Sequence, residues 1–134
     1  MKKLLFLSIA IALAACAGIK EPAELDNQKA YFAFDSAEIS KESKNDLLGQ
    51  SLYMKNHPNV KIIIEGHCDE RGSSDYNLAL GALRAGNAAH ILIKDGIESE
   101  RIKTISYGKE NPQFLGTGEE VWSKNRNATT RVKE

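Results

Sequence analysis

The stretch VKIIIEGHCDERGSSDYNLAL, residues 60–80, decides the fold, because it holds a strand, a polar loop and the start of a helix in that order. Apolar residues alternate over 60–65 on one face, and Ile63 adds apolar character to the other face, which is typical of a central strand. Residues 66–74 form the loop, and Ser73 can cap the N-terminus of the helix that follows. A strand that leads through a loop into a helix predicts an α/β arrangement.

Apolar periodicity and capping residues predict the other elements on both sides of this stretch. They are a strand over 31–34, a helix that begins after Ser40 and stops at 56–58, the second helix up to Gly96, a strand over 102–107, a short helix over 119–124 and a last strand over 128–132. The order β-α-β-α-β-(α)-β predicts an α/β fold of the α+β sandwich type, with helices packed on one mixed four-stranded sheet.

The second helix carries a predicted buried stripe at helical spacing. Its members are Tyr76, Leu80, Leu83, Ala88, Ile91 and Leu92. Gly81 and Gly86 weaken this helix by about 1 kcal/mol each relative to alanine.

Length and charge limit the class of protein. A chain of 134 residues suits one domain. The 18 basic and 18 acidic residues give a net formal charge of zero, and no basic block stands out. This balance argues against a nucleic-acid partner.

The first fifteen residues predict a removable signal peptide. Lys2 and Lys3 form a positive start, and residues 4–15 are an apolar run that ends in the small residues Ala14 and Ala15. The run is too short to span a membrane as a mature helix. A buried N-terminal helix is the alternative interpretation.

The four residues Leu13-Ala14-Ala15-Cys16 follow directly and resemble the lipobox of bacterial lipoproteins. The resemblance implies that Cys16 is acylated and becomes the new N-terminus, and Ala17 implies delivery to the outer membrane. Several acyl chains hold a protein firmly on a membrane. Cys68 is the only other cysteine, so we expect no disulfide scaffold. Residues 16–29 show no apolar periodicity, and we expect a lipidated start followed by a flexible tether.

The polar loop after the central strand carries charges of both signs. Ligands of open α/β sheets bind where strands end and helices begin, and helix N-termini present backbone N–H groups to anions. Acids together with Arg71 suit a zwitterionic ligand. A solvated loop whose charges pair with one another is the alternative.

Two segments in and after this loop, EGHCDERG (65–72) and DYNLALGALRA (75–85), resemble the OmpA-like peptidoglycan-binding domain family, and most closely its peptidoglycan-associated lipoprotein (Pal) branch. Supporting segments are YFAFD (31–35), SYGKENP (106–112) and SKNR (123–126). The resemblance covers about residues 30–128, and we assign 30–134 to this domain.

The resemblance implies non-covalent binding of the diaminopimelate-containing peptide stem of peptidoglycan, without a cofactor. Asp69 and Arg84 match the principal pair of the family, Asp35 matches a further contact, and Arg71 and Leu80 match flanking positions. Diaminopimelate ends in an ammonium and a carboxylate on one carbon. An acid can take the ammonium, and an arginine can take the carboxylate bidentately.

The resemblance also implies TolB and other Tol proteins as partners, and a role in envelope integrity and cell division. A protein–protein module that mainly binds TolB is therefore the alternative function. Three positions depart from the family pattern: Leu83 stands where a first arginine is usual, Asn127 where a second arginine follows Arg126, and Cys68 where Thr or Ala is usual.

An enzyme and a metal site are two further alternatives. Glu65, His67, Asp69 and Glu70 are close enough in sequence for acid–base chemistry, but no nucleophile pairs with a base at a recognisable spacing. His67, Cys68 and Asp69 could bind a metal, but adjacent residues of an extended chain point to opposite faces. We therefore expect no enzyme and no metal centre.

Overall fold

The computed structural model describes residues 18–133, so the predicted signal peptide and Cys16 lie outside the described residues. The strands are β1 (Gln28–Tyr31), β2 (Lys61–His67), β3 (Ile102–Gly108) and β4 (Asn127–Lys133). The helices are α2 (Lys41–Asn56), α3 (Ser74–Lys94) and α4 (Glu119–Asn125), with a 3-10 turn, η1 (Ser99–Arg101), before β3. The predicted order of strands and helices is confirmed.

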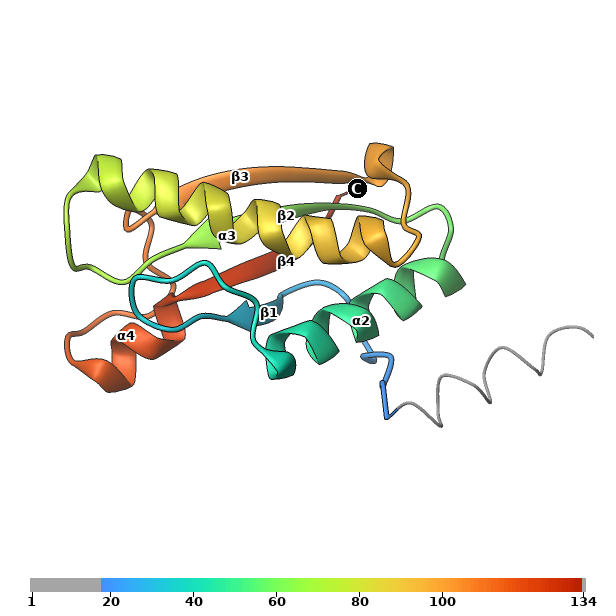
Figure 1. Cartoon of the computed structure of the whole chain (residues 1–134), viewed down its shortest axis with the longest axis horizontal. Helices are drawn as coiled ribbons and strands as arrows, with labels where there is room; N and C mark the ends of the chain where they lie inside the picture. The colour runs from blue at the N-terminus through green and yellow to red at the C-terminus, as the bar shows by residue number, and fades with distance from the viewer. Residues whose placement is uncertain (1–17, 134) are drawn as a thin grey trace, which may run out of the picture.

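The four strands form one mixed sheet in the order β1-β4-β2-β3. β4 is antiparallel to β1 and to β2, whereas β2 and β3 are parallel and are connected through α3. α2 and α3 pack together on the sheet, and α4 lies at the end where β4 begins (Figure 1). The predicted fold class is therefore confirmed.

The core lies between this sheet and the two long helices. Ile62 and Ile64 of β2 are fully buried against Leu47, Met54 and Leu92 of the helices. Each such side chain contributes about 1.5–3 kcal/mol when it is buried. Both predicted N-caps are formed: the Ser40 hydroxyl accepts from the Ser43 N–H at 3.1 Å, and the Ser73 hydroxyl accepts from the Tyr76 N–H at 3.2 Å.

The buried face of α3 differs from the predicted stripe. Tyr76 and Leu83 are 53% and 59% exposed, whereas Ala88 and Leu92 are buried as predicted. The buried face also includes Arg84 and three small residues, Gly81, Ala85 and Ala89. The reason is a close approach between α3 and β2, where a Cβ built on Gly66 would overlap the backbone carbonyl of Gly81. Gly81 is thus required for the contact between helix and sheet, although it lowers helix propensity.

The N-terminal segment also differs from the prediction, because the part of the expected tether that the structure describes packs on the domain. Leu25 is buried in the core cluster, and β1 begins at Gln28. The Asp26 carboxylate accepts from the Val132 N–H at 3.0 Å, and the Asn56 amide donates to Glu21 at 2.9 Å. One leucine gives no periodicity, so the sequence carried no local signal of this packing.

The first strand lies earlier than predicted. It spans Gln28–Tyr31, where it pairs with β4 from Thr130 to Asn127, whereas the prediction was 31–34. Of the aromatic residues that suggested a strand, Phe32 is buried beyond the end of β1 and Phe34 is exposed in the following loop. This loop runs beside the end of β2 and forms part of the candidate site.

Candidate ligand-binding site

A cleft of about 230 Å³ opens where β2 ends and α3 begins, beside the loop that follows β1. All five predicted binding residues line this cleft: Asp35, Asp69, Arg71, Leu80 and Arg84. Phe34, Cys68, Gly72, Tyr76 and Asn77 complete its lining. Residues from three separate segments therefore meet at one place in the fold.

Arg84 is built into the wall of the cleft. It is 1% exposed, and its guanidinium donates to the carbonyls of Ser36 at 2.8 Å, His67 at 2.9 Å and Ala33 at 3.1 Å. Burial lowers the pKa of Arg84 below its ordinary value. A guanidinium has five N–H donors, so three bonds leave two for a ligand. Arg84 thus ties the loop after β1 to the end of β2 and still reaches the cleft.

Asp69 is the buried acid of the cleft, and Arg71 holds both of its oxygens. The Arg71 guanidinium donates from Nη2 at 2.7 Å and from Nε at 3.2 Å, and the Arg71 backbone N–H adds a bond of 3.0 Å. Burial alone would raise the pKa of Asp69, but these hydrogen bonds and the positive charge of Arg71 outweigh it and leave the pKa below its ordinary value. Asp69 is therefore ionised at neutral pH.

Two aromatic rings enclose Arg71. Its guanidinium carbon lies 3.8 Å from the centroid of the Phe34 ring and 4.0 Å from that of the Trp122 ring. Guanidinium groups bind aromatic faces through the quadrupole of the ring. Because 31% of the Arg71 side chain stays exposed, it is a partly solvated group held by stacking and one ion pair.

Asp35 and Tyr76 form the outer part of the cleft. Asp35 has a positive φ of 52°, a conformation that aspartate adopts more readily than most residues. The Tyr76 hydroxyl donates to the Asp35 carboxylate, and this bond raises the pKa of Tyr76. The sequence interpretation missed Tyr76 as a site residue, because its spacing with Leu80 placed it in the buried stripe.

Arg126 extends the ion pair of Asp69 and Arg71 into a network. It donates to the Phe32 carbonyl at 2.9 Å and to Glu119 at 2.7 Å, and its Nη1 lies 3.5 Å from Asp69. Asn127, which departs from the family pattern, does not line the cleft. Its buried amide donates to Gln113 at 2.8 Å, which fastens the loop before α4.

The residues considered for acid–base or metal chemistry do not converge. Glu65 and His67 pair with each other at 3.2 Å and do not line the cleft, whereas the Cys68 thiol lines it and donates to the Asn77 carbonyl. Burial lowers the pKa of His67. Within residues 18–133, no group of three or more His, Cys, Asp or Glu side chains could hold a metal ion. None of the helices over the same residues is long and apolar enough to cross a membrane.

Comparison with known proteins connects this geometry to a family. The OmpA family matches residues 31–126, which include the whole cleft. This chain belongs to the OmpA family. The resemblance drawn from the sequence motifs is thus confirmed, and membership of this family agrees with the expectation of a protein that is not an enzyme.

Two curated relatives show how far the similarity extends. The chain is 42% identical over 102 residues to a peptidoglycan-associated lipoprotein of Mesorhizobium japonicum, a match of 76% of this chain and 61% of the relative. It is 40% identical over 100 residues to one of Legionella pneumophila, with 75% and 57% covered. The chain thus spans about three fifths of the length of these curated relatives.

Solved structures support the fold. The crystal structure of the peptidoglycan-associated lipoprotein from Burkholderia pseudomallei is 38% identical, with a TM-score of 0.76 over 79% of this chain and 90% of that one. The C-terminal domain of Helicobacter pylori MotB is 20% identical, with a TM-score of 0.73 over 79% of this chain and 84% of that one. At this lower identity the second match concerns the fold alone.

Proposed function

We propose that this protein is an outer-membrane lipoprotein that binds peptidoglycan non-covalently through the diaminopimelate-containing stem peptide, and so tethers the outer membrane to the cell wall. The observation that carries the proposal is the single cleft that Asp35, Asp69, Arg71, Leu80 and Arg84 line together. The similarity of this chain to peptidoglycan-associated lipoproteins supports the same ligand.

The ammonium of diaminopimelate would bind between the two acids of the cleft. A carboxylate offers about four lone-pair sites. On Asp69, Arg71 uses three of them, and Nη1 of Arg126 makes only a long contact of 3.5 Å, which a ligand ammonium could replace. The Asp35 carboxylate lies in the same cleft and has only the Tyr76 hydroxyl as its hydrogen-bond donor among the described residues. An ammonium with three N–H donors can therefore contact both carboxylates, and Asp35 is the more open of the two.

The carboxylate of the same carbon would face the arginines. Arg84 has two N–H donors that no carbonyl takes, and Arg71 presents its guanidinium at the exposed side of the cleft. Charge-assisted bonds of this kind are shorter and about twice as strong as neutral ones. Leu80 packs beside these groups and excludes water from one side of the ligand.

Attachment to the membrane would come from Cys16, acylated after removal of residues 1–15. The anchor confines the domain near the wall and raises the effective concentration of stem peptides. A weak contact with each stem is then sufficient in the cell. In this arrangement the protein would act within a Tol–Pal system that maintains the envelope during cell division.

TolB is the alternative main partner. One observation favours a protein ligand: two exposed apolar side chains lie at this end of the domain, Phe34 in the lining of the cleft and Leu115 in the loop before α4. Exposed apolar patches commonly mark sites of protein interaction. The same end of the domain would then serve both partners.

Co-sedimentation with purified sacculi, set against a pull-down from periplasmic extract, tests the proposal. We expect the wild-type protein to sediment with sacculi, and Asp35→Asn to sediment less, because it removes the more open acid. Asp46→Asn, which changes an acid of α2 outside the cleft, is the matched control and should behave as the wild type. Retention of TolB without any retention on sacculi would contradict the proposal and favour the alternative.

A further inference from the structure

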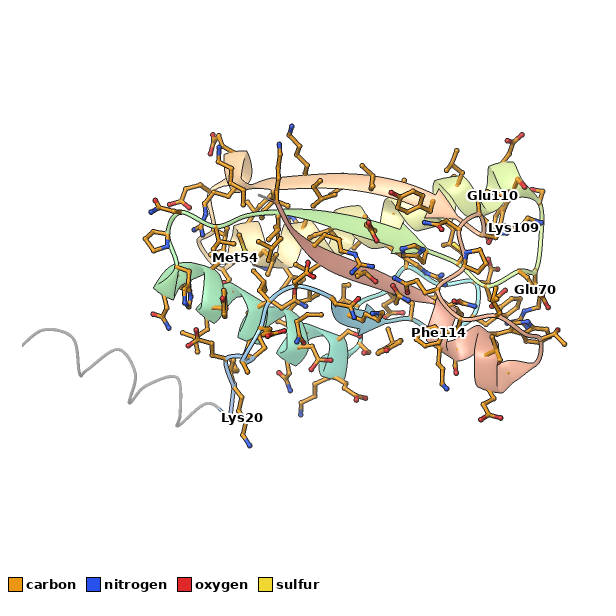
Figure 2. The ribbon with its side chains drawn as sticks, turned by 180° about the vertical axis from the view of Figure 1, so that it is seen from behind. Lys20, Met54, Glu70, Lys109, Glu110 and Phe114 are labelled. Carbon is orange, nitrogen blue, oxygen red and sulfur yellow. The ribbon has the colours of Figure 1, made fainter. Side chains whose placement is uncertain are left out.

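A second cavity of about 130 Å³ lies beside the cleft, between the loop over 109–118 and α4. Its lining includes Cys68, Glu70, Lys109, Phe114, Leu115 and Trp122. Cys68 lines both cavities, and Trp122 of the second cavity stacks on Arg71 of the cleft, so the two cavities adjoin. Figure 2 shows Glu70, Lys109 and Phe114 gathered at one end of the molecule, opposite Lys20 and Met54.

Lys109 places a cation at the junction of the two cavities. Its ammonium donates to the carbonyl of Gly72, a residue of the cleft, at 2.5 Å, while the side chain lines the second cavity. Within residues 18–133 no carboxylate lies within salt-bridge distance of Lys109. An ammonium has three donors, so Lys109 can bind an anion without giving up the Gly72 carbonyl.

The acids nearest to Lys109 are engaged elsewhere. Glu110 accepts from the Ser74 hydroxyl at 2.7 Å, and Glu70 accepts from the Thr117 hydroxyl at 2.5 Å and from the Trp122 indole N–H at 2.9 Å. These bonds hold Glu70 against the wall of the second cavity. These neutral donors leave the negative charge of Glu70 in place, but they hold its carboxylate without an ion pair to Lys109. The Lys109 ammonium therefore has no ion-pair partner among residues 18–133 and is available to an acidic ligand.

The chemistry of the stem peptide supplies such an acid. Diaminopimelate is joined to the γ-carboxyl group of the preceding D-glutamate, which leaves the α-carboxylate of that D-glutamate free. This carboxylate is the next charged group along the stem, one residue from the diaminopimelate. If the distal carbon of diaminopimelate lies in the cleft, the preceding D-glutamate must lie outside the cleft, against a neighbouring surface of the domain.

We propose that Lys109 binds the α-carboxylate of the D-glutamate, and that the second cavity receives the stem on its way to the glycan. This inference rests on the proposed function. The apolar side of the cavity agrees with it, because Leu115, at 85% exposure, and Trp122 offer a surface for the methyl groups at the glycan end of the stem. The site would thereby recognise two consecutive residues of the stem, the D-glutamate and the diaminopimelate.

A pair of stem tripeptides tests the inference. One contains D-glutamate and the other D-isoglutamine, in which a neutral amide replaces the α-carboxylate. The full chain in detergent can be titrated by the fluorescence of Trp122, its only tryptophan, which lines the second cavity and contacts Arg71. We expect the wild type to bind the acid about fivefold more tightly than the amide, the scale of a partly exposed ion pair.

Lys109→Gln should bind both tripeptides equally, with the affinity that the wild type has for the amide, and Lys109→Arg should keep part of the preference. The matched control is Lys103→Gln, since Lys103 lines neither cavity and lies near the opposite end of β3. A preference that persists in Lys109→Gln would overturn the inference. Equal binding of both tripeptides by the wild type would overturn it and leave the proposed function intact, whereas binding of neither would overturn both.

Discussion

The two arginines of the cleft, Arg84 and Arg71, have different surroundings. Arg84 is fully buried and donates to three backbone carbonyls, which belong to two segments far from Arg84 in the sequence. Arg71 is partly exposed, and one carboxylate and two aromatic rings hold it. The wall that Arg84 joins, from α3, the end of β2 and the loop after β1, is therefore the rigid wall of the cleft. The wall around Arg71 is held by side-chain contacts, and we expect it to be the adjustable one.

The largest effect that follows from this difference concerns Arg84. Arg84→Met should lower the free energy of unfolding by about 3 kcal/mol or more, because one buried and two partly buried carbonyls lose their donor. Urea unfolding followed by circular dichroism measures the change. Arg71→Met is the comparison. It leaves no backbone carbonyl without a donor, and Asp69 keeps the backbone N–H of residue 71 and Arg126 as partners, so this variant should cost less. Equal losses in the free energy of unfolding for Arg84→Met and Arg71→Met would contradict the distinction between the two walls.

A smaller effect concerns the close contact between α3 and the sheet, which positions the rigid wall. Gly81→Ala should destabilise the protein by about 1–3 kcal/mol, because the new methyl group would overlap the Ser106 hydroxyl where α3 meets the sheet. Gly86→Ala on the same helix is the matched control. Its Cβ would meet nothing within 4 Å, so the higher helix propensity of alanine should stabilise it by up to about 1 kcal/mol. If Gly81→Ala had the same free energy of unfolding as Gly86→Ala, the close approach between α3 and the sheet would be contradicted.

The smallest effect concerns the adjustable wall, and it depends on pH. The pKa of Asp69 is lowered in the folded protein, so its pair with Arg71 stabilises the fold above about pH 4, the ordinary pKa of aspartate, and this contribution is lost as pH falls through the lowered value. Arg71→Gln should therefore have a lower urea midpoint than the wild type at pH 7. The difference between the two midpoints should shrink as the pH falls through the lowered pKa of Asp69, and the part due to the stacking of Arg71 on Phe34 and Trp122 should remain. A constant difference across this range would show that Arg71 acts through its stacking alone.

Local signals in the sequence predicted much of the fold. The alternation over 60–65 identified β2, and Ser40 and Ser73 marked the starts of α2 and α3 correctly, because strand period and capping depend on neighbouring residues. The packing of Leu25 and the true start of β1 were missed, since both depend on contacts with segments about a hundred residues away.

The same limit applies to the site. The motifs supplied the five predicted residues, and the structure brings them into one cleft. The motifs marked Arg84 as a ligand contact only. Its bonds to Ala33, Ser36 and His67 are tertiary contacts, so no local pattern reveals that this residue also holds the fold together. The enclosure of Arg71 by Phe34 and Trp122 joins three distant segments for the same reason.

The central claim is that the cleft recognises the ammonium and the carboxylate on the distal carbon of diaminopimelate. Calorimetric titration with two stem peptides, one with diaminopimelate and one with lysine in its place, tests it most directly at one salt concentration. The lysine side chain ends in an amine without the carboxylate, so Arg84 and Arg71 would lack their anion, and a site built around a polar group rejects a ligand that lacks it. We expect the lysine peptide to bind at least about tenfold more weakly, a difference of about 1.4 kcal/mol. Equal affinities would contradict the account.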